Sequence, residues 1–174
     1  MNDLELLLER WANFYLLMAA AAATLIGLLF VVITLAAERR VEEAETKIRM
    51  YLTPTAIYFA SVLGVAALLT FPNHTRLTAA FCICLAGVVG LVYSGSNLIG
   101  GDRKNYVDWH DRILYAVFPF AAYGLLVLGG ALLLHFPQRG LTMMAVGMLS
   151  LLAVAIRNSW AITIVVLSAP PSRR

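Results

Sequence analysis

The chain has 174 residues, of which 61% are apolar and only 13% are charged. This composition excludes an ordinary water-soluble domain, because about a quarter of the residues of such a domain are charged. The net charge of +3 does not indicate nucleic-acid binding, since the basic residues lie in short loops between apolar runs and form no single patch.

Five apolar runs follow one another along the chain, at residues 11–37, 52–71, 77–99, 113–136 and 141–167. Each is close to or longer than the roughly 20 residues that cross the hydrocarbon core as a helix. The sequence therefore predicts an all-α integral membrane protein, a single transmembrane domain of five helices over residues 1–174. The segment before the first run, MNDLELLLER, is acidic where a signal peptide is basic, so the first helix is expected to be retained.

The loop after the first run, ERRVEEAETKIRM, is predicted to continue as a helix. Glu43 and Lys47, and likewise Glu45 and Arg49, are four residues apart with the acid first, which is the favourable order. An apolar stripe on this segment either packs on neighbouring helix ends or offers a docking surface to a partner. The stripe consists of Val41, Ala44 and Ile48.

The second and third runs match the fourth and fifth at a constant offset of 65 residues. The telling pairs are Pro54 and Pro119, Tyr58 and Tyr123, Gly64 and Gly129, and Phe71-Pro72 and Phe136-Pro137. They predict a parallel repeat of two helical hairpins related by an axis along the membrane normal, with the first run as an added N-terminal helix. Convergent hairpin chemistry is the alternative, because prolines end helices and small residues let helices approach.

The loop charges predict the orientation. The first loop, the third loop and the C-terminal tail together carry nine Lys and Arg residues, against three in the N-terminal segment and the other two loops. Lys and Arg in short loops tend to remain in the cytoplasm. We therefore expect a multi-pass membrane protein with its N-terminus outside and its C-terminus in the cytoplasm.

Motifs for catalysis are missing from the sequence. It contains no phosphate-binding glycine loop, no His-Glu-x-x-His and no Gly-x-Ser-x-Gly, and every Asp and Glu lies outside the five apolar runs. We therefore expect no enzyme, no cofactor and no metal. Two alternatives stay open, a hydrolytic or metal site in the loop 102–111, and a metal or haem held by His74 and His135.

Arg157 and Asn158 interrupt the last apolar run, AIRNSWAITIVVL. Arg157 follows Arg139 by 18 residues, about 27 Å of helix, which places it near the cytoplasmic edge of a roughly 30 Å core. We expect a rim anchor in which Arg157 snorkels and Trp160 joins the interfacial aromatic belt. The apolar residues after Trp160 then extend beyond the membrane and suggest a binding contact. Candidate partners of Arg157 are Asp102, Asp108 and Asp111.

The first run and the arginine motif resemble a set of small bacterial inner-membrane proteins, mostly uncharacterised. The shared features are a Trp-x-x-Phe-Tyr start, here Trp11, Phe14 and Tyr15, the stretch ATLIGLLFV, and RNSW near the C-terminus. Some of these proteins are labelled automatically as modulators of a membrane-bound ATP-dependent protease. This chain departs from the family pattern at Ala161, where an acid is common.

The expected function is that of a regulator or scaffold in the lipid bilayer, which acts as a homo-oligomer or through another membrane protein. It binds no nucleic acid. The alternative is a homo-oligomeric channel or small carrier in which Arg157 and Asn158 face a polar path that favours anions.

Overall fold

The computed structural model describes residues 3–38, 45–72, 75–100 and 117–168, and within these ranges the chain is all helical. The helices are α1 (Asp3–Glu38), α2 (Glu45–Thr70), α3 (Arg76–Gly100), α5 (Phe118–Leu132) and α6 (Pro137–Ser168). The predicted all-α class is therefore confirmed. Four helices contain apolar stretches long enough to cross a membrane, namely Leu6–Ala36, Leu52–Thr70, Arg76–Ser96 and Pro137–Ile164, and α5 has 15 residues.

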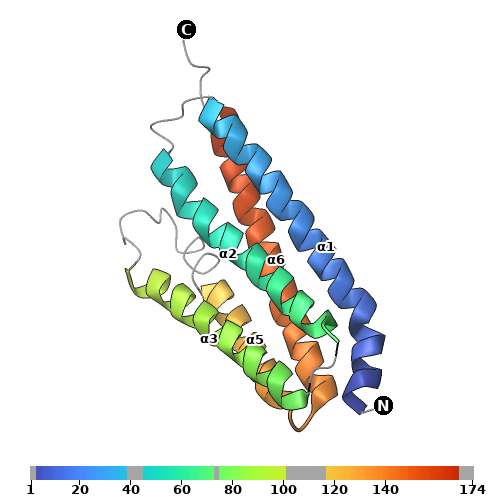
Figure 1. Cartoon of the computed structure of the whole chain (residues 1–174). Coiled ribbons are helices and arrows are strands. Elements are labelled where there is room, and N and C mark those ends of the chain that lie inside the picture. Colours follow the sequence, from blue (N-terminus) through green and yellow to red (C-terminus); the bar gives the residue numbers. More distant parts are fainter. Residues whose placement is uncertain (1–2, 39–44, 73–74, 101–116, 169–174) are drawn as a thin grey trace.

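The helices run alternately in opposite directions, so the start of α1 and the end of α6 lie at opposite ends of the bundle (Figure 1). Helix α6 lies centrally and packs against α5, α2 and α1. Helix α2 packs against α1 and α6, while α3 packs against α5 and touches α2 only slightly. The bundle thus joins a group of α1, α2 and α6 to the shorter pair α3 and α5.

Local chemistry explains where two of the helices begin. The hydroxyl of Thr75 accepts a hydrogen bond from the backbone N–H of Thr78 at 3.2 Å, and the hydroxyl of Thr78 accepts one from the N–H of Thr75 at 3.1 Å. This reciprocal pair satisfies two backbone donors at the start of α3, in the manner of a capping box. Pro137 opens α6, where the missing N–H of proline would have no intrahelical partner in any case.

Glycines bring α5 into close contact with both of its neighbours. A methyl group added to Gly90 of α3 would overlap the ring of Tyr123 on α5. A methyl group added to Gly129 of α5 would stand 2.9 Å from the carbonyl oxygen of Gly140 on α6. Since lipid removes the hydrophobic drive between helices, such close backbone approach is how they hold together in a membrane.

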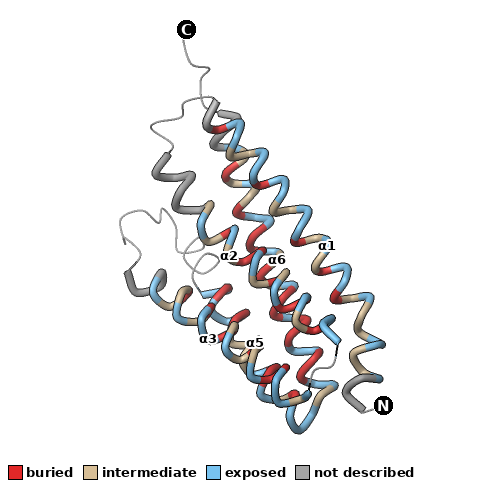
Figure 2. Tube along the Cα trace, in the orientation of Figure 1, coloured by how far each residue is buried: buried red, intermediate tan, exposed pale blue. Residues whose placement is uncertain are grey.

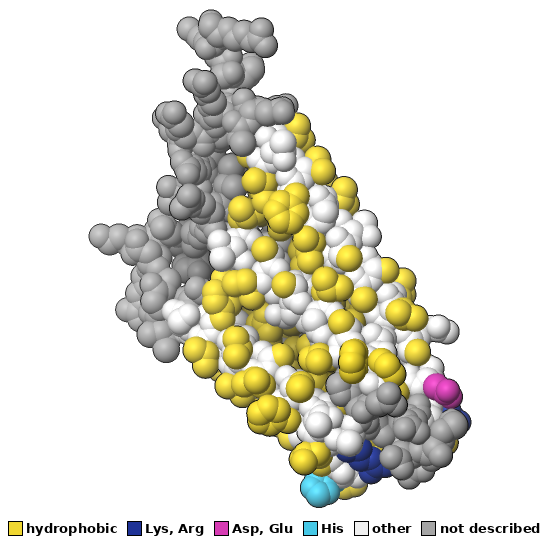
Figure 3. Space-filling view, viewed as in Figure 1, with side chains coloured by type: hydrophobic (Ala, Val, Ile, Leu, Met, Phe, Trp, Pro, Cys, Tyr) yellow, Lys and Arg dark blue, Asp and Glu magenta, His cyan; other side chains and the backbone are white. Residues whose placement is uncertain are grey.

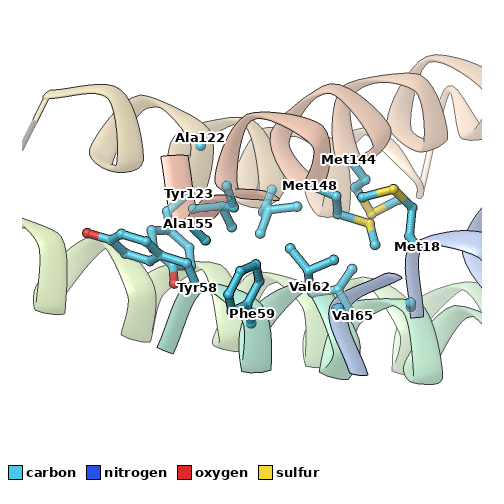
Figure 4. Close-up of a cluster of buried hydrophobic side chains, with 14 of the residues drawn as sticks. Met18, Tyr58, Phe59, Val62, Val65, Ala122, Tyr123, Met144, Met148 and Ala155 are labelled. Atoms are coloured by element: carbon cyan, nitrogen blue, oxygen red, sulfur yellow. The ribbon is translucent and has the colours of Figure 1, made fainter. Parts of the chain in front are cut away.

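The buried side chains follow α6 through the bundle, and the outward side chains are mostly apolar (Figures 2 and 3). Met18, Met144 and Met148 lie together in the core, opposite Val62 and Val65 of α2 (Figure 4). On the face that Figure 3 shows, the charged and histidine side chains of the described residues lie at the lower end, near the start of α1 and the turn from α5 into α6. An apolar belt with charges at its edge suits a chain that spans a bilayer.

The two predicted hairpins differ in their packing. Helices α5 and α6 are in close contact, whereas α2 and α3 touch only slightly (Figure 1). However, a two-fold axis between the hairpins would exchange α2 with α5 and α3 with α6. It would therefore relate the contact of α3 with α5 to the contact of α6 with α2, and both contacts are present. Tyr58 and Tyr123, which the repeat pairs, also meet each other, with ring centroids 6.2 Å apart. The parallel repeat stays a prediction, and these contacts agree with it.

Candidate functional site

Arg157 and Trp160 lie on the outward face of α6. Both are exposed, and Trp160 leaves 69% of its surface uncovered. They belong to a stripe of exposed residues spaced three or four apart, which consists of Val146, Leu149, Ala153, Arg157, Trp160 and Ile164. Arg157 is the one charged member of this stripe, so its guanidinium emerges from an otherwise apolar surface.

Asn158 lies on the opposite side of α6 from that stripe and is only 2% exposed. It shares the buried face of the helix with Gly147 and Leu151. Among the described residues its Oδ1 has no hydrogen-bond partner, and the same holds for the Oγ of Ser94 on α3, which is 1% exposed. An unsatisfied buried polar atom costs about 1–3 kcal/mol, so packing alone does not explain these two side chains.

Arg157 and Asn158 therefore point in different directions. The structure brings Trp160, and not Asn158, onto the face of Arg157. The channel alternative has both residues facing one polar path. In the structure Arg157 faces the surface of the bundle and Asn158 faces its interior, so one path does not pass both side chains.

Several predicted site residues lie outside the described residues. They are the candidate partners of Arg157, Asp102, Asp108 and Asp111, and two members of the predicted docking stripe, Val41 and Ala44. Ile48, the third member, falls within α2, but its side chain is not among those described. The ion pair and the docking stripe stay predictions.

Tyr123 of α5 links three helices. Its hydroxyl lies 2.8 Å from the hydroxyl of Ser61 on α2, and its ring contacts Tyr58 and fills the space above Gly90 of α3. The sequence did not predict this junction. The repeat pairs Tyr58 with Tyr123 and so puts them at equal distances from its axis, but that they meet at the axis is seen only in the packed bundle.

The aromatic motif at the start of the first run fastens α1 to α6. Tyr15 is fully buried, and its hydroxyl donates a hydrogen bond to the carbonyl oxygen of Leu141 at 3.3 Å. The ring of Tyr15 stacks on Trp11, with centroids 6.0 Å apart, and meets Phe14 edge to face at 5.3 Å. This motif therefore sets the register between α1 and α6 at the end of the bundle where α6 begins.

Helix α2 has one outward face made only of small residues, which we call the open face of α2. It consists of Thr53, Ala56, Ala60, Gly64 and Ala67, all of them exposed. Between Leu52 and Thr70 no large hydrophobic side chain is exposed, in contrast to the other described helices. A methyl group added to Gly64 would meet nothing within 4 Å. Nothing in the described structure covers this face.

Within the described residues, no three His, Cys, Asp or Glu side chains are grouped so that they could hold a metal ion. His135 is exposed in the turn between α5 and α6, His74 is not among the described residues, and Cys82 and Cys84 are free thiols. Comparison of the chain with protein-family models, curated proteins and solved structures found no match. Its function is therefore inferred from its own contacts and surfaces.

Proposed function

We propose that this chain is a multi-pass protein of the bacterial inner membrane that acts by binding a transmembrane helix on the open face of α2. The helix belongs to a second copy of the chain or to another membrane protein, and the role is that of a regulator or scaffold, not of an enzyme. One observation carries the proposal. Gly64 on the open face of α2 is the repeat counterpart of Gly129 on α5, which is buried against α6.

The comparison rests on one pair of glycines. Gly64 corresponds to Gly129 at the offset of 65 residues. On α5, Gly129 is buried and approaches the backbone of Gly140 so closely that no side chain would fit. On α2, Gly64 is exposed and has no neighbour within 4 Å of an added methyl group. The face thus has the composition of a helix-packing surface, and its covering helix would come from outside the described chain.

The other lipid-facing surfaces support this distinction. Phe81, Leu85 and Val92 are exposed on α3, and Leu16 and Phe30 on α1. Large side chains hold neighbouring backbones apart, whereas small ones allow the close approach on which helix association in lipid depends. Among the described helices, α1 also exposes small residues, namely Ala20, Ala23, Thr24 and Gly27, but large exposed side chains flank them. The described outward face of α2 between Leu52 and Thr70 carries no large exposed hydrophobic side chain, which favours it as the contact for another helix.

The proposal includes the orientation that the loop charges predict, with the N-terminus outside and the C-terminus in the cytoplasm. Its support is the excess of Lys and Arg in alternate loops, together with the position of the start of α1 and the end of α6 at opposite ends of the bundle. A role in binding a membrane protein is also what the resemblance to the small bacterial inner-membrane proteins implies.

The test is the mass of the complex after extraction from native membranes into polymer-bounded lipid discs. The expected result is a complex heavier than one chain, with an excess equal to a second chain or to one other membrane protein. Gly64→Leu should reduce it to a single chain, because the larger side chain blocks close approach. Gly27→Leu is the matched control, since Gly27 on α1 is equally uncovered.

Gly64→Leu is not expected to unfold the chain, because the added atoms enter open space. A wild-type chain that is extracted alone would refute the proposal. So would a complex that survives Gly64→Leu as well as it survives Gly27→Leu.

A channel or small carrier is the second candidate, and the unsatisfied buried Oδ1 of Asn158 and Oγ of Ser94 favour it. Vesicles that contain the purified chain would then pass anions or a small solute. Asn158→Leu should abolish the flux without unfolding the chain. Wild-type vesicles as tight as protein-free ones would rule this candidate out.

A further inference from the structure

Helix α6 carries two exposed arginines on one side. Arg139 and Arg157 are 18 residues apart, which is five full turns of an α-helix, so both project in the same direction. The axial distance between them is about 27 Å, close to the roughly 30 Å of a hydrocarbon core. The exposed residues between them carry no charge; they are Thr142, Met143, Val146, Leu149, Ala153 and Ile156.

Each arginine has an aromatic residue three positions away, on the side facing away from the other arginine. Phe136 precedes Arg139, whose guanidinium carbon lies 5.3 Å from the centroid of the phenyl ring. Trp160 follows Arg157 and is the more exposed of the two rings. Aromatic and basic residues gather in this way at both interfaces of a membrane. The two pairs therefore mark the two edges of the bilayer along α6.

The neighbouring helices agree with this assignment. The hydrogen bond from Tyr15 to Leu141 places Asn13 of α1 level with Arg139, and Glu9, Arg10 and Asn13 are all exposed there, as an interface requires. The apolar stretches of α2 and α3 have 19 and 21 residues, about 28 and 31 Å of helix. Both lengths match the distance between the arginines.

We propose that Arg157 and Trp160 form a binding site for the phosphate of a phospholipid, preferably one of net negative charge, in the leaflet on the C-terminal side of the membrane. A guanidinium binds phosphate oxygens through paired hydrogen bonds. Trp160 follows Arg157 by three residues and is exposed on the same face of α6, so the two side chains are neighbours on the helix surface and border one patch of the leaflet.

The test measures which lipids lie next to Trp160. Trp11→Phe and Trp109→Phe leave Trp160 as the sole tryptophan. The chain is placed in vesicles that contain equal amounts of phosphatidylglycerol and phosphatidylcholine, and one of the two lipids carries bromine on its acyl chains near the headgroup. Bromine quenches the fluorescence of a tryptophan that it contacts. We expect brominated phosphatidylglycerol to be favoured about fivefold, the preference that one basic residue gives at such a surface.

Arg157→Gln should remove this preference and Arg157→Lys should retain most of it. Arg139→Gln is the matched control, because it lies on the same face of the same helix in the other leaflet, and it should leave the preference at Trp160 unchanged. Should the tryptophan substitutions impair folding, native mass spectrometry of the otherwise intact chain supplies the second measurement. It should count fewer retained phosphatidylglycerol molecules for Arg157→Gln than for wild type.

The proposal is overturned if the two lipids quench equally in the wild type, if Arg157→Gln keeps the preference, or if bromines near the bilayer centre quench best. Excess inorganic phosphate separates the two sources of phosphate. Persistence of the preference supports a lipid headgroup, and its loss assigns the site to free phosphate instead.

Discussion

Gly90→Ala is the single-methyl substitution that most directly tests how α3 packs on α5. The added Cβ would overlap the ring of Tyr123. This ring has little freedom to move, because it contacts Tyr58 and its hydroxyl is hydrogen-bonded to Ser61 at 2.8 Å. The variant must therefore push α3 away from α5 or displace Tyr123 and break that hydrogen bond.

The expected loss of stability follows from these two costs. Overpacking a tight interface costs about 1–3 kcal/mol. A hydrogen bond between membrane helices adds about 0.6 kcal/mol when it is broken. Gly27→Ala on α1 is the matched control, since its methyl group meets nothing within 4 Å and the change in helix propensity is the same. We expect Gly90→Ala to be less stable than Gly27→Ala by about 1–4 kcal/mol, with the upper end reached where the hydrogen bond to Ser61 also breaks.

Unfolding of the detergent-solubilised chain by sodium dodecyl sulfate, followed by circular dichroism, measures this difference. Stabilities of the two variants that agree within error would refute the packing of Gly90 on Tyr123. Tyr123→Phe, made in both backgrounds, separates the two costs. A smaller cost in the Gly90→Ala background would show that Tyr123 is displaced and its bond to Ser61 broken, whereas an equal cost would show that Tyr123 keeps its place and α3 has moved instead.

Two further substitutions test single side chains by the same titration. Tyr15→Phe removes one long hydrogen bond to Leu141 and should cost less than about 1 kcal/mol, whereas Tyr15→Ala should cost about 3–5 kcal/mol through lost packing. Asn158→Leu should leave stability unchanged or raise it, because it removes a buried oxygen without a described partner. A loss of more than about 1 kcal/mol would show that the amide is paired within the protein.

The helices themselves were predictable from the sequence. In lipid every backbone N–H and C=O must be satisfied within its own segment, so an apolar run of about 20 residues has to be a helix. The boundaries were less predictable at the first helix, which begins at Asp3 and not at Trp11. Its leading turns contain Leu6, Leu7 and Leu8, of which the last two pack against the core.

The faces of the helices were not predictable in the same way. A soluble helix shows its buried side as an apolar stripe, but a membrane helix is apolar on its lipid side too, so the periodicity is weak. The depth of Arg157 and Trp160 could be estimated from a residue count, whereas the outward direction of Arg157 and the buried direction of Asn158 required the packed bundle. The contact between Ser61 and Tyr123 joins two helices 62 residues apart and had no local signal.

The length of α1 and α6 bears on where a partner would bind. Their apolar stretches have 31 and 28 residues, about 46 and 42 Å of helix, which exceeds a roughly 30 Å core by about three and two turns. The sequence suggested that the surplus after Trp160 contacts a partner. In the structure, Ile162 in this surplus is only 1% exposed and belongs to the same buried cluster as Ala36 near the end of α1. The ends of the two helices lie side by side (Figure 1). Part of the surplus therefore already serves to hold α6 to α1 beyond the level of Arg157, and the open face of α2 is the better place to look for a partner helix.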